Sequence, residues 1–374
     1  MRILSLFDGI SCGQLALRRA GVRIDKYYAS EIDKFAIKIT QTNFPNTIQL
    51  GDVNDIDFTK FIGKIDLLMG GSPCQDLSVA KQNRKGLEGE RSGLFYKYIE
   101  ALTTIKPKYF LLENVASMKK KDKDTITSII GVEPVMINSA LVSAQQRKRL
   151  YWTNIKGIEQ PKDKHIFLKD IIEGGAMSWQ DKSLCLTARY SGACFEHDVL
   201  HHARTHVAEP LGCALRTYPR TPVNGITRVK RPEIRQDGKS NALTLVNSDS
   251  TVCEPVRIGS WGKGGQGQRI YSVYGKSICL GTGGAKNERY KIDLPDGQYT
   301  IRKLTPVECE RLQTLPDNYT ACVSNTQRYK SIGNGWTVDV IAYIFSFLDE
   351  ANEVEYVKCV DFFEWVKFFR KKCA

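Results

Sequence analysis

The sequence predicts an α/β protein in which a sheet with helices on both faces is joined to a smaller domain rich in strands and loops. Through residues 1–155, short apolar runs alternate with amphipathic stretches, which is typical of βαβ units. From about residue 181 the composition shifts to Gly, Ser, Thr and Arg, and helical periodicity returns after residue 302. The 374 residues are 42% hydrophobic and 25% charged, which excludes a disordered or collagen-like chain.

Seven segments of the first part are expected to be strands, because each is a short apolar run bounded by turn residues. They span residues 3–7, 27–30, 47–50, 65–69, 109–112, 135–138 and 150–153. Helical patterns lie between them at residues 14–20, 34–43 and 94–105, and Gly21 is expected to end the first helix as its C′ residue. This alternation predicts a parallel sheet.

The middle of the chain is expected to form a basic insert of short strands. Residues 181–292 hold seventeen Lys and Arg against nine Asp and Glu, so they contribute +8 of the net charge of +13. Three loosely similar segments, at residues 182–187, 239–244 and 276–281, are each expected to form one strand with a basic entry. The charge favours a polyanionic partner, although many basic proteins bind no nucleic acid.

Three helices are expected after residue 302. Thr305 fits the N-cap of the first, with Pro306 at N1 and Glu308 at N3, and residues 338–348 fit a second helix that packs back on the sheet. Residues 362–372 form an aromatic and basic amphipathic pattern. We interpret it as a helix that caps the domain rather than as a membrane or partner surface.

Polar residues follow the first three predicted strands, and ligands of open parallel sheets bind beyond the carboxyl ends of the strands. The loop 7–13 contains glycines that allow close approach of a ligand, a feature shared by dinucleotide, nucleotide and S-adenosylmethionine binders. Glu31 and Asp52 follow the next two strands, and Glu31 can accept two hydrogen bonds from a ribose diol. Taken alone, each acid is better explained as a solvated carboxylate; their joint placement favours a cofactor with a ribose.

A candidate nucleophile follows the fourth predicted strand. Cys74 lies between Pro73 and Gln75, and the long Gly, Lys and Arg-containing loop 78–92 that follows is expected to close over it. Glu113 ends the fifth strand, where a carboxylic acid beside a cysteine can protonate or hydrogen-bond a heteroaromatic ring. The alternatives are a buried inert thiol and a helix-capping acid.

These residues, with others farther along the chain, resemble the motifs of the DNA cytosine-5 methyltransferase family in order and spacing. The matching segments are Phe7-Asp8-Gly9, Glu31, Asp52, Pro73-Cys74-Gln75, Glu113-Asn114-Val115, Gln145-x-Arg147-x-Arg149, residues 302–313 and Gly333-Asn334-Gly335. The segments at 4–10, 70–78 and 336–338 look especially like the animal de novo methyltransferases and their phage or bacterial relatives. Ser11, Cys12 and Trp336 depart from residues that many members carry.

The resemblance implies a Rossmann-like S-adenosylmethionine-dependent methyltransferase sheet and a target recognition domain in the insert. It places the catalytic and cofactor-binding domain at residues 1–160, the recognition domain at 161–300, and a return to the catalytic domain with the tail helix at 301–374. The implied reaction is methylation of carbon 5 of a flipped-out cytosine in a specific duplex DNA sequence through a covalent Cys74 adduct. Glu113 would act on ring nitrogen 3, Arg147 would contact the base carbonyl oxygen or support Glu113, and Arg149 is a secondary catalytic candidate.

The resemblance also implies binding residues for S-adenosyl-L-methionine and for DNA. The expected cofactor-binding residues are Phe7, Asp8, Gly9, Ile10, Gly13, Glu31, Ile32, Asp52, Val53, Pro73, Leu94, Asn334 and Trp336. The expected DNA-binding residues are Ser78, Lys81, Arg84, Arg189, Arg216, Arg228, Lys263 and Arg269. For any single arginine in the insert, a solvated surface charge remains the alternative.

The eleven cysteines show no Cys-x-x-Cys pair and are interpreted as reduced thiols. No apolar run is long enough for a membrane span. From these two observations we expect a cytoplasmic protein. As a bacterial or phage-encoded enzyme it would associate with the nucleoid as a monomer, and a companion restriction endonuclease is left open. No metal is expected, because the spacing of the residues that could suggest a site matches no zinc pattern. Those residues are Cys194, His197, His201, His202, His206 and Cys213.

Two other functions remain open from the sequence. One is RNA cytosine-5 methylation, against which the large basic insert argues. The other is a non-catalytic DNA-binding regulator that kept the cofactor site as a sensor, against which the retention of both Cys74 and Glu113 argues. The recognised base sequence depends on loop geometry in the insert, and the sequence does not reveal it.

Overall fold

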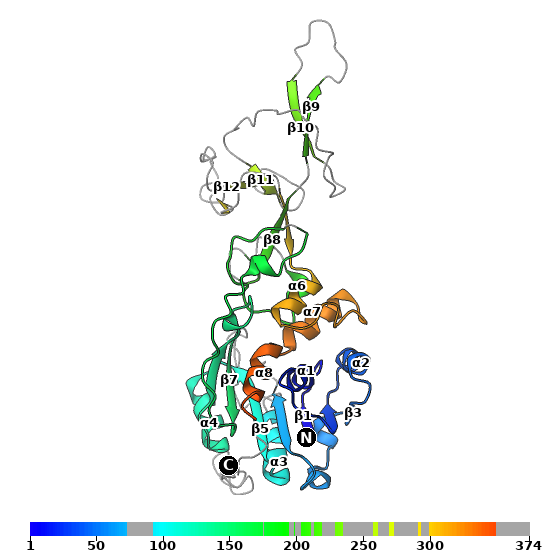
Figure 1. Cartoon of the computed structure of the whole chain (residues 1–374), viewed down its shortest axis with the longest axis vertical. Coiled ribbons are helices and arrows are strands. Elements are labelled where there is room, and N and C mark those ends of the chain that lie inside the picture. Colours follow the sequence, from blue (N-terminus) through cyan, green and yellow to red (C-terminus); the bar gives the residue numbers. More distant parts are fainter. Residues whose placement is uncertain are drawn as a thin grey trace, which may run out of the picture. The chain divides into compact units, whose positions relative to one another are not determined.

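The chain forms two compact units in a computed structural model (Figure 1). The structure describes residues 1–72, 93–174, 176–193, 198, 203–210, 213–218, 229–234, 257–260, 269–272, 291–292 and 299–348. The first unit comprises Met1–Phe167, Lys182–Gly192 and Pro306–Ala374, and the second comprises Leu168–Asp181 and Ala193–Thr305. In the described residues, no helix is both long enough and apolar enough to cross a membrane. The tail pattern at 362–372 lies outside the described residues.

A seven-stranded sheet with the order β3-β2-β1-β4-β5-β7-β6 forms the centre of the first unit. Its strands are β1 (Arg2–Leu6), β2 (Lys26–Ser30), β3 (Ile48–Gln49), β4 (Leu67–Gly71), β5 (Tyr109–Val115), β6 (Val135–Asn138) and β7 (Lys148–Thr153). All seven predicted strands are confirmed, with shifts of a few residues at their ends. Because β4 lies between β1 and β5, the loops that follow these strands meet at one edge of the sheet.

The sheet is not parallel throughout, contrary to the expectation from the alternating pattern. Strands β1 to β5 pair in parallel, whereas β7 is antiparallel to both β5 and β6. The connection 139–147 between β6 and β7 holds only the 3₁₀ turn Ser139–Leu141, which is too short for a crossover to a parallel strand. The reversal brings residues 147–149 back to the end of β5.

The first unit also contains seven described helices. They are α1 (Cys12–Arg19), α2 (Lys34–Asn43), α3 (Gly93–Ile105), α4 (Lys120–Ile130), α6 (Pro306–Leu312), α7 (Asn325–Asn334) and α8 (Val338–Phe345). The C′ position of Gly21 is confirmed: its φ is 76°, its N–H donates to Arg18 O at 3.2 Å, and the N–H of Val22 donates to Leu17 O at 3.0 Å. This pair of bonds is the Schellman motif, and it ends α1 where the sequence indicated.

One part of the core lies between the sheet and the helices α3 and α4. Leu4, Leu68 and Phe110 from three neighbouring strands pack with Tyr98 of α3 and Ile126 of α4, each at most 2% exposed. Helices α1 and α8 contact each other. Helix α1 lies on the opposite face of the sheet, since a Cβ at its Gly13 would lie 2.6 Å from the Met69 side chain of β4. The carboxyl ends of β1, β4 and β5 are therefore held by core on both faces.

The described residues of the second unit lie mainly in strands, in agreement with the prediction of a β-rich insert. Its five-stranded sheet has the order β13-β12-β11-β14-β8, and β9 pairs with β10 in an antiparallel hairpin. The strands are β8 (His206–Pro210), β9 (Cys213–Tyr218), β10 (Val229–Ile234), β11 (Arg257–Ser260), β12 (Arg269–Ser272), β13 (Lys291–Ile292) and β14 (Tyr299–Lys303).

The expected strand at 182–187 is wrong, and this segment belongs to the first unit. Only an isolated bridge joins Gln145 to Ser183, because the side chains that follow replace the ladder: Gln145 Oε1 accepts from the N–H of Leu186 at 3.3 Å, and the Arg147 guanidinium donates to Leu186 O at 3.0 Å. The other two similar segments, 239–244 and 276–281, lie outside the described residues.

Candidate functional site

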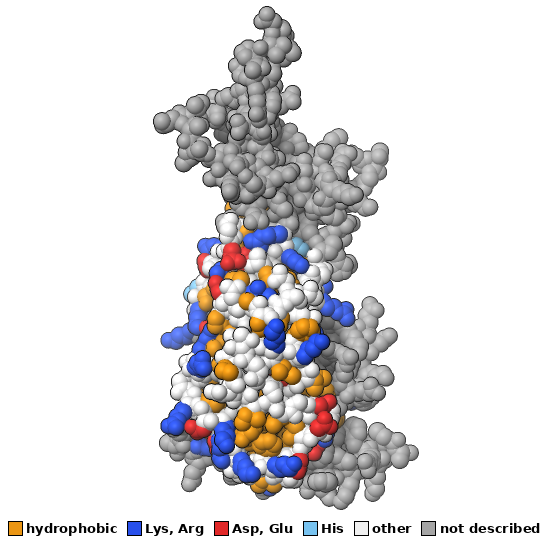
Figure 2. Space-filling view, turned by 90° about the vertical axis from the view of Figure 1, so that its right-hand side faces the viewer, with side chains coloured by type: hydrophobic (Ala, Val, Ile, Leu, Met, Phe, Trp, Pro, Cys, Tyr) orange, Lys and Arg blue, Asp and Glu red, His pale blue; other side chains and the backbone are white. Residues whose placement is uncertain are grey.

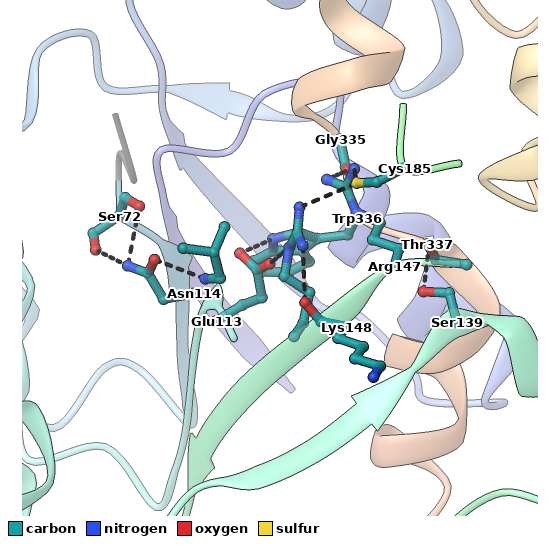
Figure 3. A network of polar contacts seen from close by, with 12 residues as sticks. Ser72, Glu113, Asn114, Ser139, Arg147, Lys148, Cys185, Gly335, Trp336 and Thr337 are labelled. Carbon is teal, nitrogen blue, oxygen red and sulfur yellow. Dashed lines mark hydrogen bonds and ion pairs between the residues drawn. The ribbon is translucent and has the colours of Figure 1, made fainter. Parts of the chain in front are cut away.

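Glu113 is the centre of the polar network at the carboxyl ends of β4 and β5 (Figure 3). Glu113 is 8% exposed, and both of its carboxylate oxygens have a partner: Arg149 Nε forms an ion pair with Oε1 at 2.8 Å, and Trp336 Nε1 donates a hydrogen bond to Oε2 at 3.2 Å. One donor comes from β7, and the other from the turn between α7 and α8. The carboxylate is therefore oriented by two fixed donors.

Gly71 provides the space for this arrangement. It pairs with Glu113 in the sheet register, and a Cβ at this position would lie 2.8 Å from Trp336 Nε1 and 3.0 Å from Glu113 Oε2. A side chain here would push the indole and the carboxylate apart. The second glycine of the Gly70-Gly71 pair is thus a packing requirement of the site.

Asn114 holds the residue that leads into the Cys74 loop. Its amide Nδ2 donates to Ser72 Oγ at 3.1 Å, and its Oδ1 accepts from the N–H of Val115 at 2.8 Å. Ser72 is 5% exposed, so this bond is buried. The expected site residues Pro73, Cys74, Ser78, Lys81 and Arg84 lie outside the described residues.

Arg147 directly precedes β7 and Arg149 lies within it, and the two side chains make different contacts. Arg147 is 4% exposed and donates to the carbonyl oxygens of Leu186 at 3.0 Å, Gly335 at 2.9 Å and Gly333 at 3.3 Å. It joins the returning segment 182–192 to the turn that carries Trp336. The contact with Glu113 is made by Arg149, the candidate that the sequence ranked second.

Cys185 is a site residue that the sequence reasoning missed. Its sulfur lies 3.5 Å from Arg147 Nη1 and 3.9 Å from Arg149 Nη2. Burial alone would raise the pKa of this thiol, but the two guanidinium groups outweigh burial and lower the pKa below its ordinary value. Burial has its usual effect at Cys12, where it raises the pKa to about 12. No motif around Cys185 indicated this contact, because it depends on the path of the insert back to the sheet.

The loop after β1 has backbone conformations that residues other than glycine rarely adopt. Phe7 and Ser11 have φ values of 59° and 56°, and Gly9 has 61°. The loop is held by Asp8, which accepts hydrogen bonds from Ser11 Oγ and, at 2.6 Å, from Tyr27 Oη. Burial raises the pKa of Asp8 in spite of these two donors. Strained backbone of this kind is frequent where a ligand is held.

Glu31 joins that loop to the end of β2. Its carboxylate accepts from the backbone N–H groups of Gly9, Ile32 and Asp33, each at 2.8 Å. Ile32 is 73% exposed beside it, although it is a large apolar side chain. An acceptor next to an exposed apolar surface fits a ligand with hydroxyl groups and a flat ring.

The remaining expected cofactor residues differ in how far they are exposed to solvent. Asn334 is exposed and Trp336 half-buried, whereas Ile10 is 1% exposed and Val53 is 4% exposed. The carboxylate of Asp52 caps the 3₁₀ turn Val53–Asp55 through Asn54. Leu94 is partly buried against the core.

Gln313 fixes the turn that carries Trp336, a role that the sequence did not indicate. Its Nε2 donates to Ile332 O at 3.0 Å and Gly335 O at 3.1 Å, and its Oε1 accepts from Thr337 Oγ1 at 2.8 Å. Gln313 is 0% exposed. The last helical segments thus hold the indole that contacts Glu113.

Of the expected DNA-binding residues, only Arg189 has a described side chain, and it is exposed. Arg216 lies on β9 and Arg269 on β12, where the side chains are not described, and Arg228 and Lys263 lie outside the described residues. Figure 2 shows one face of the molecule, and on the described part of that face the Lys and Arg side chains are scattered. Among the described residues, no group of three His, Cys, Asp or Glu side chains could hold a metal ion.

Comparisons with known proteins agree on one family. The family model for C-5 cytosine-specific DNA methylase matches residues 1–349. The chain is 28% identical to the type II methyltransferase M.HhaI of Haemophilus parahaemolyticus over 92% of this chain and 93% of that one. It is 26% identical to the orphan methyltransferase M.SPRI of Bacillus phage SPR over 93% and 97% of the two chains. The structure of the Entamoeba histolytica methyltransferase EhMeth is similar in fold, with a TM-score of 0.58, 14% identity and coverage of 94% of this chain and 99% of that one.

Proposed function

Since the chain belongs to the C-5 cytosine-specific DNA methylase family and is a DNA (cytosine-5-)-methyltransferase, we propose that it methylates carbon 5 of a cytosine flipped out of a specific duplex sequence. We further propose S-adenosyl-L-methionine as the methyl donor and Cys74 as the nucleophile. The observation that supports this proposal is the position of the buried Glu113 carboxylate. Glu113 lies on β5, next to the strand β4 that leads into the Cys74 loop, and its carboxylate is held by Arg149 and Trp336.

The proposed chemistry begins with activation of the ring, because carbon 5 of cytosine is a weak nucleophile. The Cys74 thiolate forms a bond to carbon 6, and the displaced electron pair moves toward ring nitrogen 3. Glu113, after it takes up a proton from solvent, donates that proton or a hydrogen bond to ring nitrogen 3. Carbon 5 then takes the methyl group and loses its proton to solvent water. The electron pair of that carbon–hydrogen bond restores the double bond between carbons 5 and 6, and the carbon–sulfur bond breaks to release the Cys74 thiolate. Arg149 keeps Glu113 facing the base throughout.

The residues at the ends of β1, β2 and β3 fit S-adenosyl-L-methionine, which supplies an electrophilic methyl group when bound. Glu31 Oε2 accepts one hydrogen bond from Gly9 and keeps capacity for a ribose hydroxyl, and the exposed Ile32 offers an apolar surface to an adenine ring. Phe7 would lie against the other adenine face, and Asp52 would accept from its amino group. Asn334 and Trp336 would hold the methionine side.

We propose duplex DNA as the partner of the second unit, with its arginines and lysines on the phosphates and a minority of side chains reading bases. Residues 193–292, which belong to this unit, hold fifteen Lys and Arg against eight Asp and Glu, and this excess of positive charge supports the proposal. A flipped cytosine costs a few kcal/mol of unstacking, which contacts around the base would offset. We also propose that the protein acts as a monomer in the cytoplasm at the nucleoid; whether it has a companion endonuclease stays open.

Tritium transfer from labelled S-adenosylmethionine to duplex DNA and to transfer RNA, measured side by side, tests the proposal. We expect labelling of DNA that disappears in Cys74→Ala. Exclusive labelling of RNA would contradict the proposed substrate, and DNA binding without any transfer would support a non-catalytic regulator. Bisulfite sequencing of DNA from cells that express the protein would then identify the product and the methylated site.

A further inference from the structure

The thiol of Cys185 lies at the end of a polar chain that leads to Glu113. Arg149 uses each of its three nitrogens: Nε lies 2.8 Å from Glu113 Oε1, Nη1 donates to Lys148 O at 2.9 Å, and Nη2 donates to Cys185 Sγ at 3.9 Å. The same sulfur lies 3.5 Å from Arg147 Nη1. A planar guanidinium bound at all three corners has one orientation, which is the orientation that meets the carboxylate.

The segment that carries Cys185 is anchored on both sides of the thiol, so the sulfur has a defined position. Before it, Ser183 N–H donates to Ala144 O at 2.7 Å and Ser183 O accepts from Gln146 N–H at 2.8 Å. After it, Leu186 is held by Gln145 and Arg147. Three bonds from the Lys182 ammonium to backbone carbonyls of Ala140, Ser143 and Ile166 add to this anchoring.

Electrostatics favour the same arrangement. The two guanidinium groups lower the pKa of the Cys185 thiol and so favour its ionised form, and hydrogen bonds to an ionised acceptor are stronger than those to a neutral one. Arg147 is itself fixed by backbone carbonyls, so it keeps the sulfur beside Arg149. The sulfur therefore restrains the Nη2 end of Arg149, while Glu113 contacts the Nε end.

We propose that Cys185 is a positioning residue that holds the Arg149 guanidinium against Glu113 for methyl transfer, an inference that rests on the proposed role of Glu113 in catalysis. Cys185 does not react with the base. Its effect on the reaction passes through Arg149. A segment that returns from the insert thus completes the support of the catalytic carboxylate.

Single-turnover methyl transfer to duplex DNA, at saturating S-adenosylmethionine, tests the inference. We expect Cys185→Ala to slow the rate constant on the order of ten-fold, the value of one hydrogen bond to a charged group, with the Kd for cofactor unchanged. Cys185→Ser should recover part of the rate, because a hydroxyl also accepts from a guanidinium. Cys322→Ala, which removes another partly exposed thiol of the first unit, is the matched control and should react as the wild type does.

The decisive comparison is Cys185→Ala in an Arg149→Ala background, where its effect should vanish, because residues that act through one another are not additive. An equal slowing in both backgrounds would show that the thiol acts by general packing and would overturn the inference. So would a rate for Cys185→Ala equal to that of Cys322→Ala. Absence of transfer by the wild type would instead overturn the proposed function, so the two failures are distinguishable.

Discussion

Replacement of Glu113 by glutamine tests the site with a change that keeps the side-chain shape. The carboxylate has two acceptor oxygens, and each has a donor: Arg149 Nε on one and Trp336 Nε1 on the other. A glutamine has a single acceptor oxygen, and its NH₂ group can only donate. In either amide orientation, one of the two donors therefore faces another donor.

The expected loss of stability follows from this mismatch. The side chains of Arg149 and Glu113 are 13% and 10% exposed, so water screens the lost charge only weakly. An unpaired buried donor costs about 1–3 kcal/mol, and a buried ion pair that loses one charge costs about 3–5 kcal/mol. Because glutamine can keep one of the two contacts, we expect the free energy of unfolding to fall by about 2–4 kcal/mol.

The effect on turnover is expected to be larger than stability alone can explain. Loss of a general acid lowers the rate by about 10² to 10⁴-fold. Single-turnover tritium transfer at a temperature where circular dichroism shows the variant folded measures this rate, and calorimetry should give a Kd for S-adenosylmethionine close to the wild-type value. Glu133→Gln is the control, because Glu133 is a surface acid whose side chain is 77% exposed beside Lys123. A folded Glu113→Gln protein with turnover within about three-fold of the wild type would refute the assigned role.

Three further substitutions test the rest of the site. Gly333→Ala would place a Cβ 2.3 Å from the Thr187 carbonyl carbon, so it should lower the free energy of unfolding, measured in urea, by at least about 1–3 kcal/mol. Gly192→Ala is the control and should cause no such loss, because a Cβ at Gly192 would have nothing within 4 Å; equal losses in the two variants would contradict this packing. Glu31→Ala should weaken the calorimetric Kd for S-adenosylmethionine by about 10 to 100-fold, and an unchanged Kd would exclude Glu31 from the cofactor site. Burial raises the pKa of Asp8, so the wild type loses stability as the pH rises from about 4 through that pKa. The free energy of unfolding of Asp8→Asn, relative to that of the wild type, should therefore increase over this pH range. A difference in unfolding free energy that does not change with pH would contradict the burial effect.

Local signals in the sequence were sufficient for the elements that local interactions determine. The end of α1 at Gly21 and the strand Val135–Asn138 lie where composition and turn residues indicated them. The direction of a strand could not be predicted in this way, because a period of two residues shows which side chains share a face of the strand and carries no information on whether the strand runs parallel or antiparallel to its neighbours. The hairpin of β6 and β7 therefore required the short connection 139–147 to be recognised as too short for a crossover.

The partners of Glu113 could be found only in the structure. Trp336 lies 223 residues away along the chain, and a local pattern does not show which donor meets which oxygen. The same applies to Cys185, whose segment was expected to be a strand of the insert but returns to the first unit. The sequence indicated the residue types of the site through their positions after the strands, and tertiary packing decided their pairing.

The most direct test of the central claim is covalent capture on duplex DNA that carries 5-fluorocytosine at the target position. With S-adenosylmethionine present, the fluorine cannot leave as a proton does, so the adduct should persist and mass spectrometry should find the DNA attached to the peptide that contains Cys74. The Cys74→Ala protein should yield no adduct. Attachment to another residue, or no adduct in a preparation that methylates the matching unmodified duplex, would contradict the account.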